Sequence, residues 1–96
     1  MGINELLRQK RGQILSLAAK HGASHVRVFG SVARGTADDN SDIDFLVDLE
    51  PGRSLFDLGG LLSDLEKLLA HNVDIITPTG LRARIRDRVL REAVSL

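Results

Sequence analysis

Hydrophobic residues recur along this chain with two different spacings. In three segments they return every three or four residues, which is typical of amphipathic helices. In three shorter segments, β-branched and aromatic residues alternate with polar ones, which predicts strands. The predicted helices cover residues 3–21, the leucine-rich segment between Ser54 and His71, and residues 81–94; the predicted strands cover residues 25–30, 42–49 and 73–77.

This order of elements predicts an α/β fold of the α+β type, with a three-stranded mixed sheet and helices packed mainly on one face. The chain has 96 residues, and a chain of that size typically makes one domain. We therefore expect residues 1–96 to form a single domain. The face of the sheet opposite the helices then remains available for a functional site.

The second predicted strand places two carboxylates on that free face. Asp42 and Asp44 are two residues apart, which corresponds to about 6.6 Å along a strand. Ile43, between them, points toward the core. Anions this close repel each other unless a cation lies between them. A divalent metal meets that need, and paired metals about 3.5–4 Å apart suit phosphoryl or nucleotidyl transfer.

A glycine-containing turn precedes this strand. The letters GSVARG occupy residues 30–35, and the two glycines allow a ligand to approach the backbone closely. Amides at the start of a short helix from Ser31 favour an anion, and Arg34 adds a planar positive group that suits phosphates. The turn therefore predicts phosphate binding, beside a metal site on the carboxylates.

The third predicted strand carries another candidate, Asp74. Its neighbours Val73 and Ile75 face the core, so Asp74 points to the same side as the two earlier carboxylates if this strand pairs with the second. A third metal ligand or a general base requires that geometry.

Other charged residues have simpler interpretations. Asp38 and Asp39 are alternative metal ligands, but we expect them in a solvated turn; Asp48 could widen the acidic cluster, but we expect a strand-end carboxylate in water. The three histidines fit no zinc-binding spacing and are interpreted as surface or cap residues. Five arginines between residues 82 and 91 are typical of a solvated helix face, but their density also suits a surface for phosphates or an acidic partner.

The composition excludes several classes of function. The 13 basic and 13 acidic residues cancel, so no overall field favours direct binding of nucleic acid. The absence of cysteine excludes disulfides and thiolate metal sites. No apolar run approaches about 18 residues and no signal-peptide pattern opens the sequence. These features predict a cytoplasmic protein without a membrane partner.

The two motifs together resemble the signature of the minimal nucleotidyltransferases, within the DNA polymerase beta-like nucleotidyltransferase superfamily. The resemblance rests on the glycine turn and on the Asp-x-Asp strand that follows it. It extends to the later segments VDIITP and LREAV, and so covers nearly the whole chain. The residues that carry it are Gly30, Ser31, Ala33, Arg34, Gly35, Ser41–Asp44, Val73–Pro78 and Leu90–Val94.

The resemblance implies a set of residue roles. It implies that Asp42, Asp44 and Asp74 bind Mg²⁺, with two ions expected, and act in catalysis. It implies that Gly30 and Ser31 hold the triphosphate of the donor, and it suggests a similar role for Arg34. The implied reaction moves a nucleoside monophosphate, with ATP expected as the donor.

Members of this subgroup often occur beside a helical HEPN-domain protein as toxin and antitoxin. The resemblance therefore implies that the chain adenylylates a hydroxyl of such a partner. Two alternatives stay open: an antitoxin that acts by binding alone, and a transferase for a small hydroxyl compound, as in antibiotic nucleotidyltransferases. An exposed sheet edge or the arginine-rich helix would also allow either a homo-oligomer or a hetero-oligomer.

Overall fold

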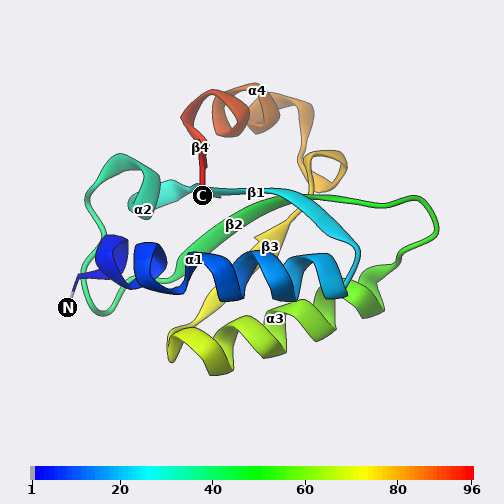
Figure 1. Ribbon diagram of the computed structural model, residues 1–96. Helices are drawn as coiled ribbons and strands as arrows, with labels where there is room; N and C mark the ends of the chain where they lie inside the picture. The colour runs from blue at the N-terminus through cyan, green and yellow to red at the C-terminus, as the bar shows by residue number, and fades with distance from the viewer. Residues whose placement is uncertain (1) are drawn as a thin grey trace.

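The computed structural model describes residues 2–96 and arranges them as a four-stranded mixed sheet with helices on both sides (Figure 1). The helices are α1 (Ile3–Lys20), α2 (Gly30–Arg34), α3 (Leu55–Leu69) and α4 (Ala83–Glu92), with a short 3-10 helix, η1, at Pro78–Gly80. The strands are β1 (Ala23–Phe29), β2 (Ile43–Leu49), β3 (Val73–Ile76) and β4 (Val94–Ser95). The predicted fold class is confirmed, with one strand more than expected.

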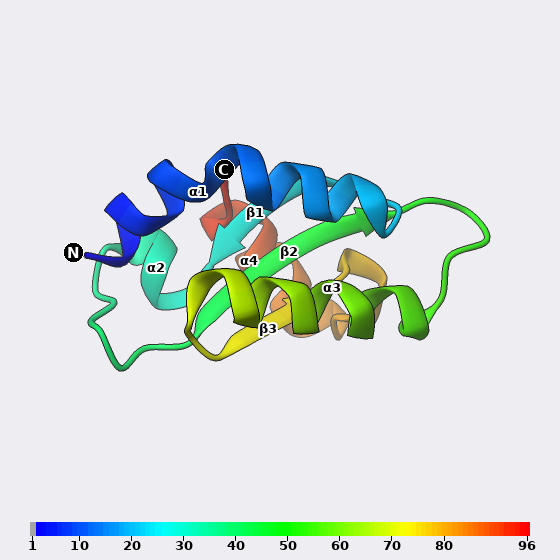
Figure 2. The ribbon, with the colours of Figure 1, turned by 60° about the horizontal axis from the view of Figure 1, so that its bottom comes forward.

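The helices cover the two faces of the sheet unequally. Figures 1 and 2 show α1 and α3 side by side on one face and α4 on the opposite face. The prediction that helices pack mainly on one face holds for the two long helices, α1 and α3. The helix α4 lies on the other face. Within residues 2–96, no helix combines the length and apolar character that a membrane crossing requires.

The strands follow the order β3-β2-β1-β4. β1 runs antiparallel to both β2 and β4, whereas β2 and β3 are parallel. Parallel neighbours need a crossover connection, and α3 supplies it between β2 and β3. The beginnings of β2 and β3 consequently lie at the same end of the sheet.

The chain end differs from the predicted helix over residues 81–94. The helix ends at Glu92, and Ala93 adopts an extended backbone with φ −63° and ψ 138°. Val94 then pairs with Val28 of β1. A β-branched valine suits a strand, and the pairing satisfies backbone groups that an open edge of β1 would expose.

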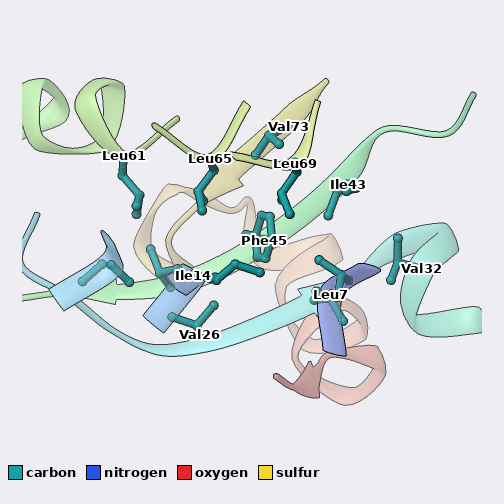
Figure 3. Packing of buried hydrophobic residues seen from close by; sticks show 14 of the residues in the cluster. Leu7, Ile14, Val26, Val32, Ile43, Phe45, Leu61, Leu65, Leu69 and Val73 are labelled. Atoms are coloured by element: carbon teal, nitrogen blue, oxygen red, sulfur yellow. The ribbon is translucent and has the colours of Figure 1, made fainter. Parts of the chain in front are cut away.

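The hydrophobic core lies between the sheet and the two long helices, with Phe45 of β2 near its centre (Figure 3). Phe45, Ile14 of α1 and Leu61 of α3 have no exposed surface, and Leu65 is 1% exposed. Burying one such side chain stabilises the fold by about 1.5–3 kcal/mol. β2 therefore contributes the residue at the centre of the core.

One glycine of α3 is explained by contact with α1. A Cβ built at Gly60 would lie 2.7 Å from Cε1 of His21, so the imidazole packs directly on the helix backbone. Nε2 of His21 also lies 2.7 Å from Oδ2 of Asp64 on the same helix. The glycine weakens the helix slightly but allows this close approach between α1 and α3.

Candidate functional site

The predicted acidic residues meet at the beginning of β2 and β3. The parallel register pairs Asp44 directly with Asp74, and neighbouring strands are about 4.8 Å apart. Asp42 lies one residue before β2 begins and is exposed. The third strand does pair with the second, which was the condition for the expected position of Asp74, and this pairing brings Asp74 to the side of Asp44.

The pKa of Asp44 responds to the charges of three other residues of the candidate site, Asp74, Asp42 and Arg34. Burial raises the pKa of Asp44 above its ordinary value of 3.8, and the charges of Asp74 and Asp42 raise the pKa further. The guanidinium of Arg34 acts in the opposite direction and lowers the pKa of this carboxyl. The ionised form of Asp44 is thus disfavoured by its surroundings, and a cation would relieve this cost.

Gly30 leaves space in front of the Asp44 carboxylate. Its φ of +67° belongs to the left-handed region, and a Cβ built on it would collide with Oδ2 of Asp44. The preceding residue, Phe29, pairs with Asp44 across the β1–β2 ladder. Any side chain at position 30 would therefore fill the space between the glycine turn and the acidic residues.

The acidic residues fit Mg²⁺ in chemistry but do not form a finished coordination sphere. Carboxylate oxygens are the ligands that Mg²⁺ prefers in proteins, and Asp42, Asp44 and Asp74 supply them from one face of the sheet. Within residues 2–96, however, no three Asp, Glu, His or Cys side chains converge closely enough to hold a metal ion.

Two cavities of different character flank the acidic residues. The larger, of about 460 Å³, opens beside Asp42 and is acidic and polar. The smaller, of about 220 Å³, opens beside Gly30 and is lined mainly by apolar surface, with two arginines and one glutamate among its lining residues. The larger cavity is lined by Asp39, Asn40, Ser41, Asp42, Glu66, Ala70, His71 and Asn72. The smaller is lined by Phe29, Gly30, Arg34, Ile85, Arg88, Val89 and Glu92.

The remaining acidic candidates have structural contacts. Asp48 accepts a hydrogen bond from Nη2 of Arg27 at 2.9 Å, so it belongs to an ion pair rather than to the acidic site. Oδ1 of Asp38 accepts from the backbone N–H of Asn40 at 2.9 Å within the loop. Asp39 was expected in a solvated turn, and it also lines the larger cavity.

The sequence did not indicate that α4 contributes to this site. The cavity beside Gly30 brings Arg88 and Glu92 against the glycine turn, about sixty residues away in the chain. The spacing of Arg88 and Glu92 signals a pair on one helix side. Where that side would lie was not readable from the pattern, because it depends on how α4 packs on the sheet.

A comparison with protein families identifies the family to which this chain belongs. The model of the nucleotidyltransferase domain matches residues 10–96. This chain belongs to the nucleotidyltransferase domain family. A solved structure described as "putative minimal nucleotidyltransferase" is 54% identical, covers 96% of this chain and 94% of its own, and superposes with a TM-score of 0.87. The chain is thus an enzyme of the minimal nucleotidyltransferase type.

Curated relatives share much of the sequence. A Methanocaldococcus jannaschii protein named "putative protein adenylyltransferase" is 40% identical over 96 residues, which cover 100% of this chain and 99% of the relative. The protein adenylyltransferase MntA of Thermococcus cleftensis is 41% identical over 78 residues, 81% of this chain and 79% of the relative. A toxin–antitoxin structure with AMP-PNP has the same fold, at 22% identity and a TM-score of 0.74, covering 88% of this chain and 69% of that chain.

Proposed function

We propose that this nucleotidyltransferase moves AMP from ATP to a hydroxyl of a partner protein, as the antitoxin of a HEPN-type toxin. The observation that carries the proposal is the pairing of Asp44 with Asp74 in front of a glycine that leaves room for a ligand. The names of the Methanocaldococcus jannaschii and Thermococcus cleftensis relatives support a protein acceptor and an adenylyl group. We place this reaction in the cytoplasm, where ATP is available.

The acidic residues supply the metal site of the proposal. Asp42, Asp44 and Asp74 would hold Mg²⁺, whose chemistry is to neutralise charge that develops at the transferring phosphoryl group. The raised pKa of Asp44 supports this role, because burial and two neighbouring carboxylates make an added cation favourable.

The remaining residues would bind the donor and accept the proton of the acceptor hydroxyl. The backbone of Gly30 and Ser31 would hold the terminal phosphates, with Arg34 beside them. The acceptor hydroxyl oxygen forms a bond to the α-phosphorus, the bond from that phosphorus to the bridging oxygen breaks, and pyrophosphate leaves. Asp74, exposed and next to Asp44, would accept the hydroxyl proton.

The decisive experiment is intact-mass spectrometry of a co-expressed partner. The partner is incubated with this protein, Mg²⁺ and each nucleoside triphosphate in turn. We expect a mass gain of one AMP, or a small number of them, with ATP. The same gain should vanish when Asp42→Ala and Asp44→Ala are combined, provided that circular dichroism shows the variant to be folded.

A second candidate, neutralisation by binding alone, is favoured by a separate observation. Leu55 and Phe56 at the start of α3 are 82% and 92% exposed, an apolar pair that suits contact with a partner. Stable complex formation without any mass gain would support this candidate. Transfer that persists in the folded double variant would contradict the assignment of the acidic residues.

A further inference from the structure

Glu92 of α4 lies between two arginines at the edge of the glycine turn. Its Oε2 is 3.5 Å from Nη1 of Arg34 on α2. Its Oε1 accepts a hydrogen bond from Nε of Arg88, one helical turn earlier, at 3.2 Å. One carboxylate therefore engages two guanidinium groups that come from different elements of the fold.

All three residues line the smaller cavity, together with Gly30. Its volume of about 220 Å³ is below the roughly 300–1,000 Å³ typical of pockets that enclose a whole small-molecule ligand. The size suits a compact anionic group rather than a complete nucleotide. The cavity also adjoins the Asp44 carboxylate through Gly30, so such a group would lie next to the acidic residues.

The position of Arg88 separates it from the other arginines of α4. Ile85, Arg88, Val89 and Glu92 share one side of the helix at intervals of three and four residues, and all four line the cavity. Arg86 is two residues from Arg88 and so points about 200° away around the helix. The helix thus offers one arginine toward the cavity and a matched arginine that faces elsewhere.

We propose that Arg88 and Arg34 together bind the terminal phosphates of the donor nucleotide, and that Glu92 competes with those phosphates for the two guanidinium groups. This inference rests on the proposed function, because it assigns residues to the triphosphate of the same donor. It makes α4 a part of the donor site and Glu92 an internal anion that the nucleotide must displace.

The energetics favour such an exchange. The side chains of Arg34 and Arg88 are 49% and 67% exposed, and ion pairs this exposed to solvent contribute little to stability. A phosphate offers more acceptor oxygens and more charge than a carboxylate, and arginine binds it through two parallel hydrogen bonds. Displacement of Glu92 therefore costs little, and the phosphates gain stronger contacts.

The test is calorimetric titration of the full chain with ATP and with AMP in the presence of Mg²⁺. We expect Arg88→Ala to weaken ATP binding roughly tenfold, which corresponds to about 1.4 kcal/mol, since the variant loses charged hydrogen bonds to the phosphates. AMP, which lacks the terminal phosphates, should bind Arg88→Ala and the unmodified protein equally. Glu92→Gln should tighten ATP binding by roughly two- to fivefold, because the competing charge is removed.

Arg86→Ala is the matched control, since it removes the same charge from the other side of α4. Equal weakening of ATP binding by Arg88→Ala and Arg86→Ala would overturn the proposal, because a general electrostatic effect would explain both. Weaker ATP binding by Glu92→Gln would overturn the proposal that Glu92 competes with the phosphates, because Glu92 would then hold the two arginines in position for them. Failure of the proposed function is distinguishable, since the unmodified protein would then bind no ATP or transfer no AMP.

Discussion

The two faces of β2 differ in what their side chains contribute. Toward α1 and α3, Ile43 and Phe45 have no exposed surface and contact apolar residues from both helices. Toward α4, Leu46 is also fully buried, but Asp44 is only partly buried and lies beside Asp74. The covering helix α4 has no buried residue of its own.

This contrast indicates how a small domain combines stability with chemistry. The helix-covered face is held by many apolar contacts, so its geometry is well determined. The opposite face brings like charges together under a helix that has no buried residue, and this arrangement disfavours the ionised form of Asp44. Substitutions on the first face should therefore change stability, whereas substitutions on the second should change activity.

The largest effect is expected for Phe45→Ala. Removing this fully buried ring leaves a cavity in the core and should lower the free energy of unfolding by about 3–5 kcal/mol. Urea denaturation measures the change. The matched control is Phe56→Ala, whose ring is 92% exposed, and which should change stability by no more than about 0.5 kcal/mol. Similar losses for both variants would contradict the assigned core.

On the opposite face, Asp44→Asn should reduce transfer by about 100-fold or more, because it removes a carboxylate that we propose to hold Mg²⁺, and the metal would stabilise the charge of the transition state. Its unfolding free energy should stay equal or rise slightly, since a disfavoured charge disappears. The rate is measured as label moved from α-phosphate-labelled ATP to the partner, and stability by urea denaturation. Normal transfer by the folded variant would remove Asp44 from the site.

Two glycines of the turn distinguish the effect of backbone conformation from the effect of a steric clash with Asp44. Gly30 and Gly35 both have a left-handed φ, of +67° and +75°, so alanine at either position should cost about 1–2 kcal/mol of stability. Only the Cβ at position 30 would meet the Asp44 carboxylate, whereas nothing lies near position 35. Gly30→Ala should therefore also impair ATP-dependent transfer. Equal activities of Gly30→Ala and Gly35→Ala would contradict the proposal that a ligand occupies the space between Gly30 and the Asp44 carboxylate.

The smallest effect concerns pH. The pKa of Asp44 is raised in the folded protein, mainly by burial and then by Asp74 and Asp42, so the folded state binds more protons than the unfolded state and stability falls as pH rises. The loss begins above the ordinary pKa of 3.8 and is complete once the pH exceeds the folded pKa. Solvent screening should keep it below about 1 kcal/mol.

Comparison with Asp44→Asn isolates this contribution from other titrating groups. The unmodified protein should lose stability relative to the variant as the pH is raised from acid to neutral in urea titrations. Mg²⁺ should reduce the difference at neutral pH, because a cation favours the ionised carboxylate. A difference that is independent of pH would show that the carboxyl is not disfavoured by its neighbours.

Local patterns were sufficient for much of the fold. Leucines at helical spacing predicted α3, and the alternation of Ile43, Asp44 and Phe45 predicted the two faces of β2. The turn at Gly30 also followed from sequence, since residues close in the chain determine it. The family signature draws on these same local features, which explains why the nucleotidyltransferase domain was recognisable before any geometry was known.

The tertiary structure decided which distant residues meet. Only the parallel register of β3 brings Asp74 beside Asp44, and only the packing of α4 brings Glu92 between Arg34 and Arg88. Strand register and helix placement depend on contacts between segments far apart in the chain, which leave no short-range pattern in the sequence. The chemistry of the individual groups was thus readable from the sequence, whereas their assembly into one site required the fold.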